Sequence, residues 1–164
     1  MTPQQFDKRI SSLIRLLQRD KSDAIKKPMK DLENTMKERI FKKGLNSKGS
    51  KIGKYGKYYS PEYKSLWIPL RKSRGLQTKF VDLKFTGDLS DSFTSDKVDK
   101  DSVGIGFSDD ENYEKSLIQE ILQGQKKGGR SMDIFTPRRS ELTKMQKEAV
   151  KSIEDELEKL FSKF

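Results

Sequence analysis

Residues 80–107 read FVDLKFTGDLSDSFTSDKVDKDSVGIGF, and this stretch decides the fold of the chain. Apolar and polar residues alternate over Phe80–Phe85, as they do in a strand with one buried face. Residues 86–88 (Thr-Gly-Asp) end that strand, because Gly and Asp favour turns. Two further strands, Leu89–Val98 and Ser102–Phe107, follow and are joined by a polar turn. The stretch therefore predicts a small antiparallel sheet.

The sequence after this stretch predicts two helices that cover the sheet. Asp109–Gln125 has acids in its first turn and five apolar residues at helical spacing, which we expect to face inward. They are Tyr113, Leu117, Ile118, Ile121 and Leu122. Met132–Phe135 is predicted as a short edge strand. A longer amphipathic helix then starts between Pro137 and Ser140 and runs to the C-terminus.

Two more helices are predicted before the sheet, because apolar residues recur at helical spacing in both halves of residues 1–44. The first ends at about Arg19–Lys21, and the second covers about Ser22–Lys43. Pro28 either kinks the second helix or lies in its first turn. Gly44 is its expected C-terminal stop. The two helices form a hairpin that is either an extension or a second layer of the fold.

These elements together predict an α+β fold. A small, mainly antiparallel sheet is covered by two helices, including the long C-terminal helix, and carries an N-terminal helical extension. We divide the chain into the hairpin (1–44), a basic arm rich in Tyr and Gly with a short helix from Ser60 (45–78), and an α+β core with the C-terminal helix (79–164). No apolar run approaches the ~20 residues of a membrane span, so we expect no membrane contact.

The composition argues against an enzyme. The chain contains neither histidine nor cysteine, which removes the commonest general base, the commonest metal ligand and every thiolate site. We therefore predict no catalytic residue, no cofactor and no metal site.

Three short motifs approach known sites without completing them. Residues 44–51 have the glycine spacing of a phosphate loop, but Ser50 stands where that loop needs Lys. Asp99–Asp110 matches several positions of a calcium loop, but Val103 supplies no oxygen ligand where one is needed. Asp82 begins an acid-x-Lys pattern that resembles half of a metal-dependent nuclease site. A nuclease remains a third hypothesis, which requires Mg²⁺-dependent cleavage.

Charge is unevenly distributed along the chain. Lys26–Lys79 contains 16 Lys or Arg against 4 Asp or Glu, whereas Asp88–Glu114 contains 9 acids against 2 lysines. The basic part can face nucleic acid. Alternatively, the basic and acidic parts can dock against each other between neighbouring subunits of a ring. The simplest alternative is that the lysines only solvate helix surfaces.

The candidate contact residues lie in the basic arm, in a short basic cluster and in the acidic turn. Lysine and tyrosine interleaved in an exposed arm suit a nucleic-acid backbone and its bases, and tyrosine suits a protein interface equally well. The candidates for subunit or DNA contact are Lys48, Lys51, Lys54, Tyr55, Lys57, Tyr58, Tyr59, Arg71, Lys72, Arg74, Asp88 and Asp91.

Several short motifs from Asn46 to the C-terminus resemble those of a known family. They are the TGDL turn and S-F strand start, the VGIGF strand, YSPEY at Tyr59–Tyr63, RKSRG at Arg71–Gly75, and the F-T-P-R-R junction at Phe135–Arg139. In this pattern and in the helices that follow it, the chain is similar to the head–tail joining and tail-completion proteins of long-tailed bacteriophages, the phage virion morphogenesis group.

The resemblance implies a structural virion protein at the head–tail junction (neck) or at the head-proximal tail end, as a tail-completion or terminator protein. Such proteins form rings, commonly hexameric or dodecameric, around the DNA channel. The implied partners are portal or adaptor and tail-tube proteins, with non-specific DNA contact in the channel, in a virion assembled in the host cytoplasm. The alternative is a sequence-independent nucleic-acid-binding protein that uses the basic 26–79 region.

Overall fold

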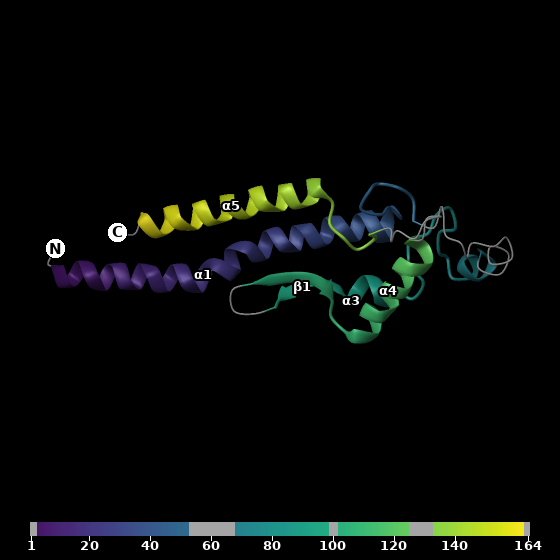
Figure 1. Cartoon of the computed structure of the whole chain (residues 1–164), viewed down its shortest axis with the longest axis horizontal. Coiled ribbons are helices and arrows are strands. Elements are labelled where there is room, and N and C mark those ends of the chain that lie inside the picture. The colour runs from purple at the N-terminus through teal and green to yellow at the C-terminus, as the bar shows by residue number, and fades with distance from the viewer. Residues whose placement is uncertain (1–2, 53–67, 99–101, 125–132, 163–164) are drawn as a thin grey trace.

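One long helix dominates the chain (Figure 1). The computed structural model describes residues 3–52, 68–98, 102–124 and 133–162. Helix α1 spans Pro3–Lys37, and a π-helical turn, η1 (Glu38–Lys42), follows it directly. The predicted helical hairpin is therefore wrong, because the chain makes no turn near residue 21. The helix continues through Pro28, whose side chain is fully buried, so tertiary packing outweighs the roughly 3 kcal/mol that a proline costs inside a helix.

The C-terminal half of α1 is the middle layer of the fold. Helix α5 (Arg139–Phe161) runs antiparallel along one side of it, and the sheet lies on the other side (Figure 1). In the sheet, β1 (Phe93–Lys97) pairs antiparallel with β2 (Val103–Phe107), and Phe93 lies opposite Phe107. The α+β class and the antiparallel pairing are confirmed. The sequence predicts the N-terminal helical region to be either an extension or a second layer of the fold. The C-terminal half of α1 forms a layer.

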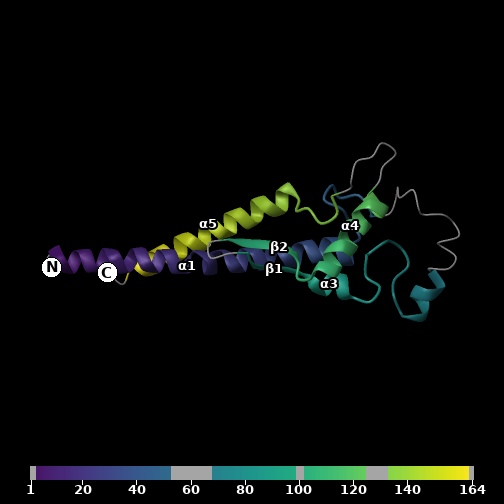
Figure 2. The ribbon, with the colours of Figure 1, turned by 60° about the horizontal axis from the view of Figure 1, so that its bottom comes forward.

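Two helices flank the sheet at its open end (Figure 2). The short α3 (Asp88–Ser92) directly precedes β1, and α4 (Asp110–Gly124) follows β2. The first part of the predicted strand Leu89–Val98 is thus helical. Gly87, with φ 109°, turns the chain into α3, a left-handed conformation that glycine tolerates. The predicted helix Asp109–Gln125 is confirmed as α4.

The predicted strand Phe80–Phe85 is not formed. This segment instead bends around the guanidinium of Arg71, which lies on a helical turn at residues 68–73. Arg71 Nη2 donates to both carboxylate oxygens of Asp82, at 2.8 and 3.0 Å, and its other nitrogens donate to the carbonyls of Gln77 and Lys84. Leu83 has φ 52°, so the backbone cannot keep the alternation of a strand.

The core lies where α1, the sheet and the segment before α5 meet. Phe107 joins them, because its ring lies 5.3 Å from Phe93 and 5.1 Å from Phe135 in edge-on contacts. Asp133–Phe135 is a bent segment and not the predicted edge strand, whose first residue, Met132, lies outside the described residues. The buried apolar side chains are Met29, Leu32, Met36, Ile40, Phe41, Ile52, Phe93 and Ile134. The predicted regions 1–44 and 79–164 therefore share one core.

Gly44 ends the long helix, as the sequence predicts. It has φ 61°, and a Cβ at this position would collide with the Val81 carbonyl and the Phe80 ring. The amide of Leu45 donates to the carbonyl of Arg39 at 2.9 Å, which satisfies a carbonyl at the end of the helix. The helix predicted to begin at Ser60 starts outside the described residues.

Candidate interaction surfaces

A buried ion pair holds η1 to the start of α5. Arg39 Nε donates to Glu141 Oε1 at 2.8 Å, and both side chains are buried. The remaining guanidinium nitrogens donate to the carbonyls of Leu45, Ile134 and Thr136. Burial lowers the pKa of Arg39, and the Glu141 carboxylate opposes that shift. With every donor group satisfied, this pair is a structural lock rather than a reactive site.

A second buried carboxylate holds α1 to the sheet. Glu33 is 1% exposed and accepts hydrogen bonds from Lys30, Lys37 and both donors of Ser95 in β1. Burial raises the pKa of Glu33, but the hydrogen bonds from Lys30, Lys37 and Ser95 together outweigh it and lower the pKa from 4.5 to about 2. Glu33 is therefore ionised in the folded protein except in strong acid.

Helix α4 packs on the body through its polar side. Asp109 accepts hydrogen bonds from the backbone and side chain of Asn112, which cap the helix and lower the pKa of Asp109. Asn112 and Ser116, one turn apart, are the buried positions among residues 110–121 of the helix, whose burial the structure describes. Ser116 satisfies its hydroxyl by donating to the Tyr113 carbonyl at 2.6 Å. Small polar side chains thus occupy the inward face, where a core helix carries apolar ones.

The apolar side of α4 faces outward, contrary to the prediction from its sequence. Tyr113, Leu117, Ile118 and Ile121 are each 44–56% exposed, and the side chain of Leu122 lies outside the description. The cause is that α1 covers the sheet, so α4 packs against α3 and β2 at the edge of the fold, and its Glu120 accepts a hydrogen bond from the Phe135 amide. The pair Asn112 and Ser116, at i and i+4, is the sequence signal that marks the inward face.

The outer side of α5 is a second exposed surface. Val150, Ile153 and Phe161 are 55%, 39% and 63% exposed. Exposed cations precede them on the same helix, and a shallow, open hollow lies at its beginning. The residues lining this hollow are Arg139, Ser140, Thr143, Lys144 and Lys147.

Two of the predicted contact lysines lie on one ordered turn. Buried Asn46 accepts from the amides of Lys48 and Ser50, a local bond typical of asparagine turns. Lys48 and Lys51 are both exposed on this turn. Lys51 already donates to the Lys43 carbonyl at 2.9 Å, so Lys48 is the more available of the two for an external anion.

The second basic cluster is divided by the structure. Arg71 is buried against Asp82 and presents no guanidinium to the surface, which removes it from the predicted contact residues. The same ion pair occupies the Asp82 carboxylate that the nuclease hypothesis requires. Lys72 is exposed, and Arg74 is exposed with its guanidinium 4.3 Å from the centre of the Phe85 ring.

The predicted acidic contacts are on the surface near α4. Asp88 and Asp91 are both exposed on α3, and Asp88 accepts a hydrogen bond from the Thr86 hydroxyl at 2.8 Å. The other predicted contact residues, Lys54, Tyr55, Lys57, Tyr58 and Tyr59, lie outside the described residues.

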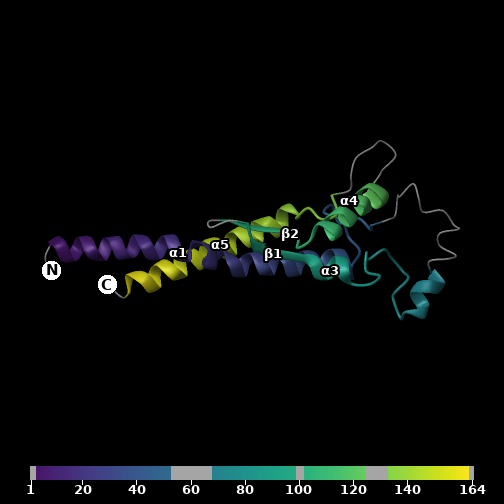
Figure 3. The same cartoon turned by 90° about the horizontal axis from the view of Figure 1, so that it is seen from below.

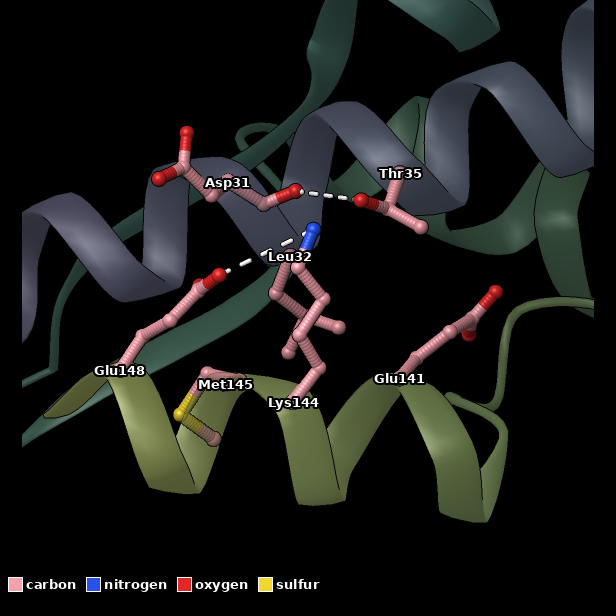
Figure 4. Close-up of a pocket in the computed structure, with 7 residues that line it drawn as sticks. All are labelled: Asp31, Leu32, Thr35, Glu141, Lys144, Met145 and Glu148. Atoms are coloured by element: carbon pink, nitrogen blue, oxygen red, sulfur yellow. Dashed lines mark hydrogen bonds and ion pairs between the residues drawn. The ribbon is translucent and has the colours of Figure 1, made fainter. Parts of the chain in front are cut away.

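A notch between α1 and α5 is too small for a ligand (Figure 4). Its volume is about 10 Å³, which suits about one water molecule. Leu32 and Met145 line its floor, and the Lys144–Glu148 ion pair of 3.7 Å lies at its edge. Over residues 3–52, 68–98, 102–124 and 133–162, no group of three or more acidic side chains is placed to hold a metal ion.

No protein-family model, curated protein or solved structure matches this chain. Within the described part of the chain, no helix combines the length and apolar character needed to cross a membrane. A functional argument therefore starts from three surface features: the apolar face of α4, the outer side of α5 and the exposed lysines near Asn46.

Proposed function

We propose that this chain is a structural assembly subunit that works as a ring in the virion of a tailed bacteriophage. The proposed place is the head–tail junction (neck) or the head-proximal tail end, around the DNA channel. Its action is mechanical: copies associate, and the ring gives portal or adaptor proteins on one side and tail-tube proteins on the other a surface for docking.

The observation that carries the proposal is the outward apolar face of α4. Four large apolar side chains on one helix are about half exposed, while small polar residues fill the inward side. Contiguous exposed apolar patches on soluble proteins mark interaction surfaces. A protomer with a small core and such a face is best explained as one part of a larger assembly.

The order of elements supports the virion part of the proposal. After the TGDL turn, the chain forms α3, the strand that begins at Phe93, the VGIGF strand, α4 and α5. The resemblance to the phage virion morphogenesis group expects a strand at the S-F motif, a strand at VGIGF, and then two helices. The strand it expects before the turn is replaced by the segment around Arg71.

Light scattering combined with negative-stain imaging, with and without DNA at moderate salt, tests the proposal. We expect a closed ring of uniform mass that DNA leaves unchanged. The double variant Ile118→Ser with Ile121→Ser should dissociate it. Val98→Ser is the matched control, because Val98 is 72% exposed but lies on the sheet hairpin. A wild-type protein that assembles only on DNA, or a ring unaffected by the α4 changes, would contradict the proposal.

A second candidate is sequence-independent nucleic-acid binding, which is favoured by the exposed lysines Lys42, Lys48 and Lys72 of the basic region. It predicts DNA binding by the protomer that weakens steeply with salt, since each neutralised phosphate releases counterions. The double variant Lys48→Gln with Lys72→Gln would then flatten that salt dependence, and a ring that binds DNA weakly at all salt concentrations would exclude this candidate.

A further inference from the structure

We propose that α4 of one copy docks on the outer side of α5 of the next copy, in a head-to-tail contact. This inference rests on the proposed self-association and names the two surfaces that make it. The occupant of the α4 face is thus a second copy of this chain, recognised by apolar contact and by opposite charge.

The α4 surface combines apolar and acidic side chains. Asp110, Glu111 and Glu114 are exposed, and at 100° per residue they fall on the same side of the helix as the exposed apolar residues. The helix contains four acids and one base, Lys115, which pairs with Glu111 at 2.6 Å. A partner of this face must therefore offer apolar surface together with positive charge.

The outer side of α5 offers both. Arg139 and Lys147 are exposed in the first half of the helix, and Lys151 is exposed at its middle. The acids of that half face α1, since Glu141 is buried and Glu148 is half-buried beside Lys144. The exposed apolar residues Val150, Ile153 and Phe161 occupy the second half. The described part of α5 is thus basic at its beginning, whereas its end carries these apolar side chains together with the exposed acids Glu154, Asp155 and Glu158.

The two surfaces match in one direction only. On α4 the acids lie at residues 110–114 and the apolar residues extend to Ile121. On α5 the cations lie at residues 139–151 and the apolar residues extend to Phe161. A parallel alignment places acids over cations and apolar residues over apolar residues at the same time, whereas an antiparallel alignment mismatches both. This alignment brings Ile118 near Val150.

The positions of the two helices suit repeated head-to-tail contact. Helix α5 lies on one side of α1 and α4 on the other (Figure 1), and α4 lies beyond the start of α5 when the molecule is seen from below (Figure 3). One copy can therefore use both surfaces at once. A contact between two different surfaces repeats from copy to copy and closes into a ring when the rotation allows it.

Cysteine cross-linking tests the contact, because the natural chain contains no cysteine. Two full-length chains, Ile118→Cys and Val150→Cys, carry tags of different mass and are mixed with a short bismaleimide. Both positions are exposed, so neither change disturbs folding. We expect the mixed 118–150 product to exceed either homotypic product by about tenfold. Asn34→Cys, exposed on α1, replaces Ile118→Cys in the matched control and should give no product with Val150→Cys.

Charge reversal supplies the second arm of the test. Lys147→Glu with Lys151→Glu should reduce the 118–150 product about tenfold, and Glu111→Lys with Glu114→Lys on the other chain should restore it. A dominant 118–118 product would overturn the inference in favour of an α4–α4 contact. No product from an oligomer seen by light scattering would overturn the inference and leave self-association standing. A monomer at every concentration would overturn both.

Discussion

The C-terminal half of α1 and the helix α4 carry similar apolar stripes and have opposite fates. On α1 and the η1 turn that continues it, Met36 and Ile40 are fully buried between α5 and the sheet. On α4, Leu117 and Ile118 are about half exposed, and Ser116 faces the body instead. The difference shows that an apolar stripe predicts that a helix face is buried, but does not predict which surface covers it. For α1 the partner is in the same chain, and for α4 we propose another copy.

The largest effect is expected where the ion pair of Arg39 and Glu141 holds η1 to α5. Arg39→Leu leaves Glu141 buried without its cation and should lower the free energy of unfolding by about 3–5 kcal/mol. Urea denaturation followed by circular dichroism measures this change. The double variant Arg39→Leu with Glu141→Leu is the control and should recover much of the loss. If the free energy of unfolding of Arg39→Leu lies within about 1 kcal/mol of the wild-type value, the ion pair does not set the long helix apart from α4.

The second effect concerns the contact of α1 with the sheet and depends on pH. The folded pKa of Glu33 is about 2, below its ordinary 4.5, so the unfolded chain binds more protons between these values. The stabilisation, on the order of 2–3 kcal/mol, is therefore full above about pH 5 and is lost as pH falls toward 2. Glu33→Gln should remove this pH dependence, measured as urea midpoints at about pH 7 and pH 3. If the urea midpoint falls equally in variant and wild type between these pH values, groups other than Glu33 cause the acid sensitivity.

A smaller effect is expected at the end of the long helix. Gly44→Ala places a Cβ against the Val81 carbonyl at positive φ and should cost about 1–2 kcal/mol. Gly106→Ala in β2 is the matched control, because nothing lies within 4 Å of its added Cβ. Thermal unfolding of both variants measures the difference. Equal midpoints would show that the turn after η1 adapts freely.

The smallest effect on the protomer is expected on α4. At concentrations where the protein is dissociated, Leu117→Ala should change the free energy of unfolding by less than about 0.5 kcal/mol. Met36→Ala, the same kind of change on α1, should cost about 2–5 kcal/mol. Denaturant titrations of the two variants sharpen the comparison directly. A large loss at Leu117 in dissociated protein would mean that α4 packs inward in solution.

The local sequence pattern predicted those described elements that depend mainly on residues close to them in the sequence. The hairpin of β1 and β2, the bounds of α4 and the start of α5 all follow from caps, turns and spacing. It failed where a distant charge decided the backbone: Phe80–Phe85 alternates like a strand, yet the buried Arg71 guanidinium bends it. It also failed near residue 21, where it predicted a turn between two helices and the structure has one continuous helix.

The candidate surfaces were only partly predictable for the same reason. Charge runs correctly indicated exposed Lys48 and Asp88, because lysine and aspartate are mostly solvated. They gave no sign that Arg71 is buried, since its partner Asp82 is 11 positions away. The outward orientation of α4 depends on α1 covering the sheet, and the spacing of apolar residues does not say which helix takes that place.

The continuous helical backbone of α1 and η1 extends beyond the hydrophobic core of this small chain. The two elements contain 35 and 5 residues, and a rise of about 1.5 Å per residue makes them a rod of roughly 60 Å. Pro28 has no backbone N–H, so one hydrogen bond is missing from the series that runs along this rod. We expect a force applied at the N-terminal end to reach the turn where Arg39 and Glu141 meet through the covalent backbone and the remaining helical hydrogen bonds.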